Sequence, residues 1–139
     1  LPKPPADTPK IGKIFEGRKI LVAEDNPMNM LLISEVLGNM GIEVTRASNG
    51  EEAIDMLVQH HPEMIFMDVN MPLLDGYAAT KQIRQLPQPH CGIPIIALTA
   101  DAMEEDKERC LKAGMNNYIS KPFQLKEIQA MLKNYLSKT

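Results

Sequence analysis

The sequence has 139 residues, of which 44% are hydrophobic, and a formal net charge of −3 at neutral pH. This length fits a single domain, and the acidic balance lacks the basic surface expected of a nucleic-acid-binding protein. Since no apolar run is long enough to span a membrane, we expect no direct membrane contact. We expect a cytoplasmic location. If the sequence is part of a longer protein, that protein could be anchored in the inner membrane.

The beginning of the sequence differs in composition from the rest. The first residue is Leu1, and four of the first ten residues are proline, a composition typical of a semi-rigid linker. We therefore expect a proline-rich linker over 1–17 and one folded domain over 18–139, excised from a longer chain.

Strands and helices alternate throughout the expected domain. Strands are predicted where branched apolar residues run together, and helices where apolar residues recur three and four positions apart. The predicted strands cover 19–23, 42–47, 64–67, 94–98 and 117–120, and the predicted helices cover about 27–40, 49–60, 76–84, 101–113 and 125–135. Five strand–helix units in strict alternation predict a parallel sheet with helices on both faces, an α/β fold. The second strand is the least apolar, so we expect it at an edge.

Local signals predict where helices begin and which residues face the core. Asn26 is a good N-cap for the first helix, with Pro27 at its first position. Ser48 and Glu51 have the spacing of a capping box before the second helix. In the last helix, the residues expected to face inward are Leu125, Ile128, Leu132 and Tyr135.

Four of the five predicted strands have a polar side chain at their carboxyl end. These residues are Glu24, Asp25, Asp68, Thr99 and Lys121. Because open α/β sheets bind ligands outside the carboxyl ends of their strands, we expect these side chains to share one site.

Three crowded carboxylates repel one another, and a divalent cation relieves that repulsion. Oxygen ligands without histidine or cysteine favour a hard ion, so we predict Mg²⁺, with Mn²⁺ as the alternative. The expected ligands are Asp25, Asp68 and the backbone carbonyl of Asn70, with Glu24 acting largely through water.

A metal ion beside a lysine and a hydroxyl suits a phosphoryl group. In this interpretation Asp68 is the nucleophile that forms an aspartyl phosphate, Lys121 neutralises phosphoryl oxygens and Thr99 donates a hydrogen bond. Asn70 and Asp101 are placed where their side chains could influence attack by water and so tune the lifetime of the phosphate.

Two other groups of residues have competing interpretations. His60 and His61 are neighbours on a helix, and their side chains point apart, so they do not predict a shared metal site. Met28, Met30 and Leu31 lie on the first helix beside the acidic site. They either form an apolar patch that docks a histidine-bearing helix, or pack into the core.

The polar residues belong to four motifs that occur in a fixed order. They are LVAEDN at 21–26, MDVNMPLLDG at 67–76, LTA at 98–100 and KPF at 121–123. Over 18–137 the chain resembles the receiver domain of response regulators. The resemblance implies a flavodoxin-like three-layer (βα)5 fold with strand order 2-1-3-4-5, and makes 18–139 a receiver, or phosphoacceptor, domain.

The resemblance also implies a mechanism of two-component, phosphorelay signalling. Asp68 would take a phosphoryl group from a phosphohistidine on a partner. Thr99 and Tyr118 would report the phosphate to the surface of the fourth helix, the fifth strand and the fifth helix. The bond between Lys121 and Pro122 is a candidate cis peptide. A receiver catalyses its own phosphorylation and dephosphorylation but is not a turnover enzyme.

Glu24 stands where many receivers have aspartate, and together with Asn29 it makes the chain similar to receivers inside hybrid sensor histidine kinases. The implied partner is a histidine-containing phosphotransfer domain or a histidine kinase dimerisation domain. A stand-alone receiver and a homodimer are alternatives. The residues expected to dock the partner are Asn26, Pro27, Met28, Met30, Leu31, Pro122 and Phe123.

Two other functions compete with the receiver. A phosphatase of the haloacid dehalogenase kind also uses an aspartate at a strand end with Mg²⁺. That family has a second aspartate two residues on, where this chain has Asn70, and the chain is too short for a cap domain. The other alternative is a pseudo-receiver that acts only as a scaffold, against which the complete set of acidic, hydroxyl and lysine residues argues.

Overall fold

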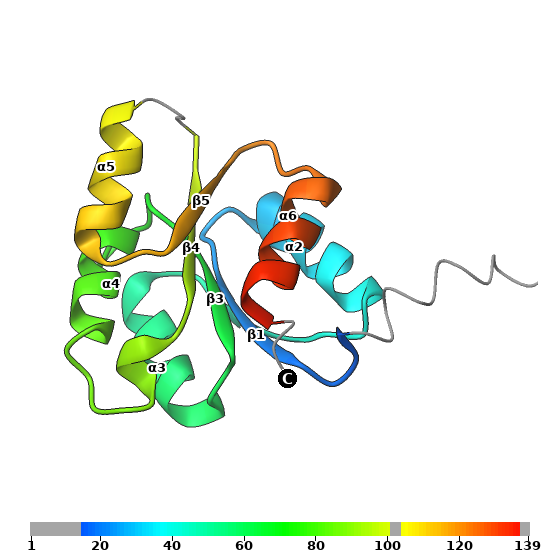
Figure 1. The fold of residues 1–139 in the computed structure, drawn as a ribbon, viewed down its shortest axis with the longest axis horizontal. Helices are drawn as coiled ribbons and strands as arrows, with labels where there is room; N and C mark the ends of the chain where they lie inside the picture. The colour runs from blue at the N-terminus through cyan, green and yellow to red at the C-terminus, as the bar shows by residue number, and fades with distance from the viewer. Residues whose placement is uncertain (1–14, 101–103, 137–139) are drawn as a thin grey trace, which may run out of the picture.

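The computed structural model describes residues 15–100 and 104–136 (Figure 1). Five parallel strands form one sheet in the order β2-β1-β3-β4-β5, which confirms the expected flavodoxin-like α/β fold and the edge position of the second strand. The strands are β1 (Lys19–Ala23), β2 (Glu43–Ala47), β3 (Met64–Asp68), β4 (Ile95–Thr99) and β5 (Asn117–Ser120).

Within residues 15–100 and 104–136, five helices and one 3-10 turn follow these strands along the chain. They are α2 (Pro27–Asn39), α3 (Gly50–His60), α4 (Gly76–Ile83), the 3-10 turn η1 (His90–Gly92), α5 (Glu104–Ala113) and α6 (Leu125–Leu136). None of the helices in the described part of the chain has the length and apolar character needed to cross a bilayer.

The sheet is the middle of three layers (Figure 1). Helices α2 and α6 cover one face, and α3, α4 and α5 cover the other. Alternate residues of β3 serve the two faces: Met64 and Phe66 pack with α2 and α6, whereas Ile65 and Met67 pack with the other three helices. Every residue of β3 and β4 is buried, as expected for strands covered on both sides.

Two local predictions were wrong. The capping box before α3 lies one residue later than expected: Asn49 is the N-cap and accepts a hydrogen bond from the Glu52 N–H at 2.8 Å, while Glu52 accepts one from the Ser48 N–H at 2.7 Å. Leu125 is exposed, because it opens α6 at a position that faces away from the sheet. The buried face of α6 consists of Ile128, Leu132 and Leu136.

Phe15 lies within the range expected to be linker, yet its side chain is completely buried. It packs into the core between the sheet and helices α2 and α6. The next turn of chain is fixed by Gly17, which has a φ of 82° and donates a hydrogen bond to the Gly41 carbonyl at 2.9 Å. The folded unit therefore extends at least to Phe15.

One side chain, that of Arg84 at the end of α4, holds the irregular segment before β4. Its Nη1 donates to the carbonyls of Cys91 at 2.9 Å and Ile93 at 2.7 Å. Its Nε donates to the Gly114 carbonyl at 2.8 Å and its Nη2 to Asn116 Oδ1 at 2.9 Å. Arg84 thus joins the entry to β4 with the entry to β5.

Candidate functional site

Three carboxylates meet at the carboxyl edge of the sheet. Ala23 of β1 pairs with Met67 of β3, so the residues that follow, Glu24 and Asp68, emerge side by side. One oxygen from each of Glu24, Asp25 and Asp68 lies within 4.8 Å of the others. Glu24 and Asp68 are buried and Asp25 is exposed, so the cluster opens to solvent on one side.

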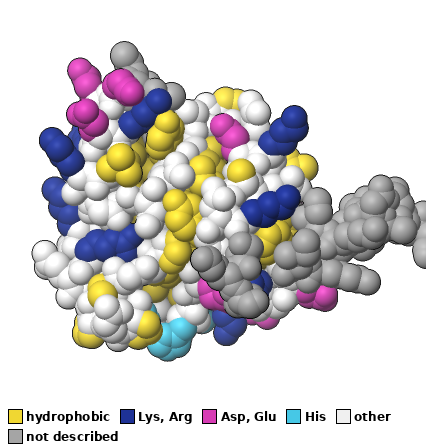
Figure 2. Space-filling model, in the orientation of Figure 1, with side chains coloured by type: hydrophobic (Ala, Val, Ile, Leu, Met, Phe, Trp, Pro, Cys, Tyr) yellow, Lys and Arg dark blue, Asp and Glu magenta, His cyan; other side chains and the backbone are white. Residues whose placement is uncertain are grey.

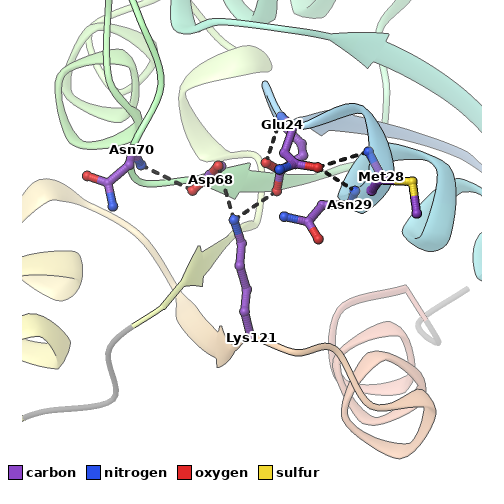
Figure 3. A network of polar contacts seen from close by, with 7 residues as sticks. Glu24, Met28, Asn29, Asp68, Asn70 and Lys121 are labelled. Carbon is purple, nitrogen blue, oxygen red and sulfur yellow. Dashed lines mark hydrogen bonds and ion pairs between the residues drawn. The ribbon is translucent and has the colours of Figure 1, made fainter.

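Lys121 extends from the end of β5 into this cluster (Figure 3). Its Nζ lies 3.2 Å from Asp68 Oδ2 and 3.1 Å from Glu24 Oε1. The Lys121 N–H donates to the Thr99 carbonyl at 2.8 Å, which fixes the base of the side chain against β4. One ammonium group therefore lies between two buried carboxylates.

The site has more negative than positive charge, and the pKa values reflect this. Burial and the neighbouring Glu24 together raise the pKa of Asp68 to about 6. The Asn70 N–H, 3.1 Å from Asp68 Oδ1, and the Lys121 ammonium act in the opposite direction but do not offset this rise. Burial alone would lower the pKa of Lys121, but Glu24 and Asp68 reverse that effect and raise it. The buried, oxygen-only donor set fits a hard divalent cation such as Mg²⁺.

Thr99 is the last residue of β4 and is buried beside the site. Its neighbour Leu98 pairs with Asp68, so Thr99 stands at the same edge of the sheet as the carboxylates. Asn70 is exposed, and both Asn70 and Asn29 line the cavity above Asp68. The position of Asn29 in this wall was not predicted; the available signal was its place in the first turn after a capped helix start.

The start of α4 presses against the back of Asp68. A Cβ on Gly76 would lie 2.3 Å from the Asp68 carbonyl oxygen, so only glycine fits without a shift of the backbone. The Gly76 N–H donates to the Val69 carbonyl at 3.1 Å, and Asp75 caps α4 by accepting from the Ala78 N–H at 2.8 Å. This packing holds the strand end that carries Asp68.

The start of α2 places an apolar surface next to the cavity. Asn26 accepts hydrogen bonds from the Met28 and Asn29 N–H groups at 2.9 and 3.1 Å, which confirms it as the N-cap. Met28 is 72% and Leu31 49% exposed, but Met30 is buried in the core. Met30 is therefore removed from the expected docking set, because its side chain faces the sheet.

The remaining residues of the expected docking set flank the other side of the cavity or the start of α2. Pro27 and Pro122 are exposed, and Phe123 is partly buried against the core. The bond between Lys121 and Pro122 is cis, as the resemblance implied.

Of the other expected site residues, Tyr118 is described and Asp101 is not. Tyr118 is partly buried on β5, and Lys107 of α5 lies over its ring, 5.3 Å from the ring centre. The ring thus links β5 to the surface of α5. Asp101 lies outside the described residues, so its predicted role stays a prediction.

Comparison with known proteins identifies the family. A model of the response regulator receiver domain matches residues 20–133, and the chain belongs to this family. It is a receiver domain of two-component phosphorelay signalling, homologous to the receivers of hybrid histidine kinases. This assignment favours the receiver over a phosphatase of the haloacid dehalogenase kind.

Among individual proteins, the chain is similar to part of a hybrid histidine kinase. The chain is 42% identical over 121 residues to the hybrid signal transduction histidine kinase K of Dictyostelium discoideum, an alignment that covers 83% of this chain. The chain spans 10% of the length of that kinase.

Two solved structures are close in shape. The receiver domain of a sensor histidine kinase from Pseudomonas aeruginosa PAO1, with magnesium coordinated in its active site cleft, is 42% identical with a TM-score of 0.79, over 86% of this chain and 97% of that one. The receiver domain of the Saccharomyces cerevisiae response regulator Ssk1, crystallised with the histidine phosphotransfer protein Ypd1, is 30% identical with a TM-score of 0.77, over 85% and 88%.

Proposed function

We propose that Asp68 accepts a phosphoryl group from a phosphohistidine on a partner protein, in a reaction that depends on Mg²⁺ or Mn²⁺. The observation that carries this proposal is the position of the Lys121 ammonium, 3.2 Å from Asp68 Oδ2 and 3.1 Å from Glu24 Oε1. The same lysine that neutralises the carboxylate at rest is placed to neutralise a phosphoryl group bonded to it.

The chain's own groups divide the work of phosphoryl transfer. A carboxylate oxygen of Asp68 forms the new P–O bond as the P–N bond to the donor imidazole breaks, and the imidazole leaves with the bonding electron pair. Lys121 neutralises charge on the phosphoryl oxygens, and the Thr99 hydroxyl donates to one of them. Glu24, Asp25, Asp68 and the Asn70 carbonyl would hold the metal ion, which supplies further positive charge to the phosphoryl oxygens.

The partner is a histidine phosphotransfer domain or a histidine kinase dimerisation domain. Support comes from the Ssk1 receiver, which was crystallised with a phosphotransfer protein, and from the exposed Met28 and Leu31 beside the cavity. An apolar patch formed by Met28 and Leu31 suits the side of a helix that presents its histidine to Asp68. Asn26, Pro27, Pro122 and Phe123 complete the proposed contact.

Phosphorylation at Asp68 would shift an equilibrium between two states of the α5, β5 and α6 surface. Thr99 would sense the phosphate, and Tyr118 would transmit the change to α5, which it already contacts through Lys107. Asn70 and Asp101 would set the lifetime of the phosphate. The similarity to hybrid kinase receivers supports an origin in such a kinase. We propose that this part of the kinase lies in the cytoplasm.

Intact-mass spectrometry tests the phosphorylation directly. The protein is incubated with Mg²⁺ and acetyl phosphate, and we expect one phosphoryl adduct that is absent from Asp68→Asn and present in Asp55→Asn, which neutralises an exposed carboxylate on α3. No adduct on the wild type with Mg²⁺ would indicate a scaffold. Continuous release of phosphate from unrelated phosphomonoesters would indicate a phosphatase.

A second measurement separates docking from chemistry. Replacing both Met28 and Leu31 by alanine should slow transfer from a phosphohistidine protein at least tenfold, while labelling by acetyl phosphate stays unchanged. Val58→Ala removes a similarly exposed apolar side chain from α3 and should change neither rate. Equal transfer rates for all three proteins would place the partner elsewhere.

A further inference from the structure

Two histidines lie face to face at the end of the molecule opposite Asp68. His61 follows α3 and precedes β3, and His90 opens η1 before β4. Their ring centres are 5.2 Å apart and their planes differ by 13°. In Figure 2, histidine side chains are visible at the bottom of the molecule, beside hydrophobic side chains.

The two imidazoles line one cavity, whose wall also includes Glu63, Gln88 and Ile93. Within the described residues, neither ring forms a hydrogen bond or an ion pair. The nearby carboxylate is already engaged, because Glu63 Oε1 lies 2.6 Å from Arg18 Nε. The histidine nitrogens are therefore donor atoms in this cavity that no other described residue engages.

The backbone fixes where both rings start. His61 has a φ of 52°, an unusual value for a residue other than glycine, and its N–H donates to the Leu57 carbonyl at 3.1 Å. The His90 N–H donates to the Pro87 carbonyl at 3.1 Å, and the His90 carbonyl accepts from the Ile93 N–H at 3.2 Å. Ligands held by a fixed backbone need only side-chain rotation to adjust.

The spacing of the rings suits a shared ion. A Zn–N bond is about 2.0–2.1 Å long, which puts the centres of two imidazoles on one tetrahedral ion about 5 Å apart. From the stacked arrangement, one ring must turn about its Cβ–Cγ bond to aim its nitrogen at the ion, and this torsion is soft in histidine.

We propose that His61 and His90 bind a divalent transition-metal ion of the Zn²⁺ type, with water completing its coordination. Imidazole suits such ions, whereas Mg²⁺ prefers oxygen, so this site and the acidic cluster at Asp68 would select different metals. An ion bound here would join the end of α3 to the loop that enters β4.

His60 offers a matched control within the same sequence. It is the last residue of α3, is exposed, and is absent from the cavity that His61 and His90 line. A site built on the pair across the cavity needs His61 and His90. A nonspecific effect of clustered histidines would depend equally on His60.

The test uses the whole chain in excess Mg²⁺, so that the acidic cluster is occupied, and titrates Zn²⁺ by calorimetry. We expect one ion per chain, with affinity reduced at least tenfold by His61→Asn or His90→Gln and unchanged by His60→Gln. Asparagine is chosen at position 61 because it tolerates the left-handed backbone, and circular dichroism checks each fold. Equal losses in all three variants would overturn the proposal, as would loss of binding in Asp68→Asn.

Nuclear magnetic resonance of the wild type tests the same site without mutation. Zn²⁺ should shift the imidazole signals of His61 and His90 and leave those of His60 in place. Binding should weaken severalfold or more between about pH 7.5 and 5.5, because imidazole binds metal only in its neutral form. Shifts confined to His60, or binding that does not change over this pH range, would contradict the assignment.

Discussion

The ammonium group of Lys121 reaches the carboxylate of Asp68, at 3.2 Å, from the far side of a strand. Asp68 ends β3 and Lys121 follows β5, so this ion pair crosses the end of β4. The contact spans the end of β4, where Thr99 is the last residue. It therefore couples the chemistry of the site to the packing of β5, the edge strand on this side of the sheet.

Neutralising Asp68 should stabilise the metal-free protein. Asp68→Asn keeps the shape of the side chain and removes its negative charge. In the wild type, burial of that charge beside Glu24 raises the pKa of Asp68 to about 6. We expect the free energy of unfolding at neutral pH to rise by about 2 kcal/mol, measured by urea denaturation without divalent ions. Asp55→Asn on the exposed face of α3 should change it by less than about 0.5 kcal/mol. A destabilised Asp68→Asn would contradict the charge excess inferred for the site.

The same residue should give the stability a pH dependence. Because the pKa of Asp68 is raised from 3.8 to about 6 on folding, the folded state holds the proton more tightly than the unfolded state. The free energy contributed by this group is therefore present below pH 3.8 and is lost as the pH rises through about 6. Between about pH 4 and 7 the wild type should lose more stability than Asp68→Asn, and saturating Mg²⁺ should reduce the difference at pH 7. Parallel pH profiles for the two proteins would refute this.

Removing the lysine should have the opposite effect. Lys121→Met leaves Glu24 and Asp68 buried without a cation, and breaking a buried pair from one side is costly. We expect a loss of about 2–3 kcal/mol in the metal-free protein, partly restored by Mg²⁺, together with slower labelling by acetyl phosphate. Lys126→Met, at an exposed position of α6, is the control. Full stability in the Lys121 variant would mean that solvent already screens the carboxylates.

Gly76 and Gly38 allow a matched comparison of glycines. Gly76→Ala places a methyl group against the Asp68 carbonyl and should destabilise the protein by about 2–4 kcal/mol and slow phosphorylation. Gly38→Ala lies in α2 with open space around it and should stabilise by about 0.5–1 kcal/mol. Thermal denaturation and acetyl phosphate labelling measure both effects. Equal tolerance at the two positions would show that α4 can move away from β3 at little cost.

Phe15 should matter for stability although it precedes the segment that matches the receiver family. Phe15→Ala empties a fully buried position and should cost about 3–4 kcal/mol. Glu16→Ala, at the exposed neighbouring residue, should change little. Chemical denaturation of the two variants distinguishes an anchored Phe15 from one that contributes nothing.

Much of the fold follows from patterns that a sequence carries locally. The continuous apolar run before Asp68 indicates a strand covered on both faces, and the weaker pattern of 42–47 indicates an edge; both agree with the structure. The convergence of Asp25, Asp68 and Lys121 follows because carboxyl ends of parallel strands share an edge. Strand order came from resemblance, since alternation alone does not fix it.

The errors arose where a residue's neighbours come from elsewhere in the chain. Met30 and Met28 have the same chemistry, and only the rotation of α2 against the sheet decides that one is buried and the other exposed. Phe15 follows a proline-rich stretch, and no local pattern shows that it joins the core formed by the sheet, α2 and α6. The stacking of His61 on His90 likewise joins residues far apart in the sequence, so no local pattern indicates it.

The hydrogen bonds of Arg84 have a consequence for how the molecule opens. Its guanidinium reaches Asn116, whose Oδ1 also accepts from the Ile95 N–H at 2.8 Å at the start of β4. It also binds the carbonyl of Ile93, two residues before that strand. The backbone before β4 and the backbone before β5 therefore cannot fray independently. They form one cooperative unfolding unit with a single side chain at its centre, and their amide protons should exchange with solvent together.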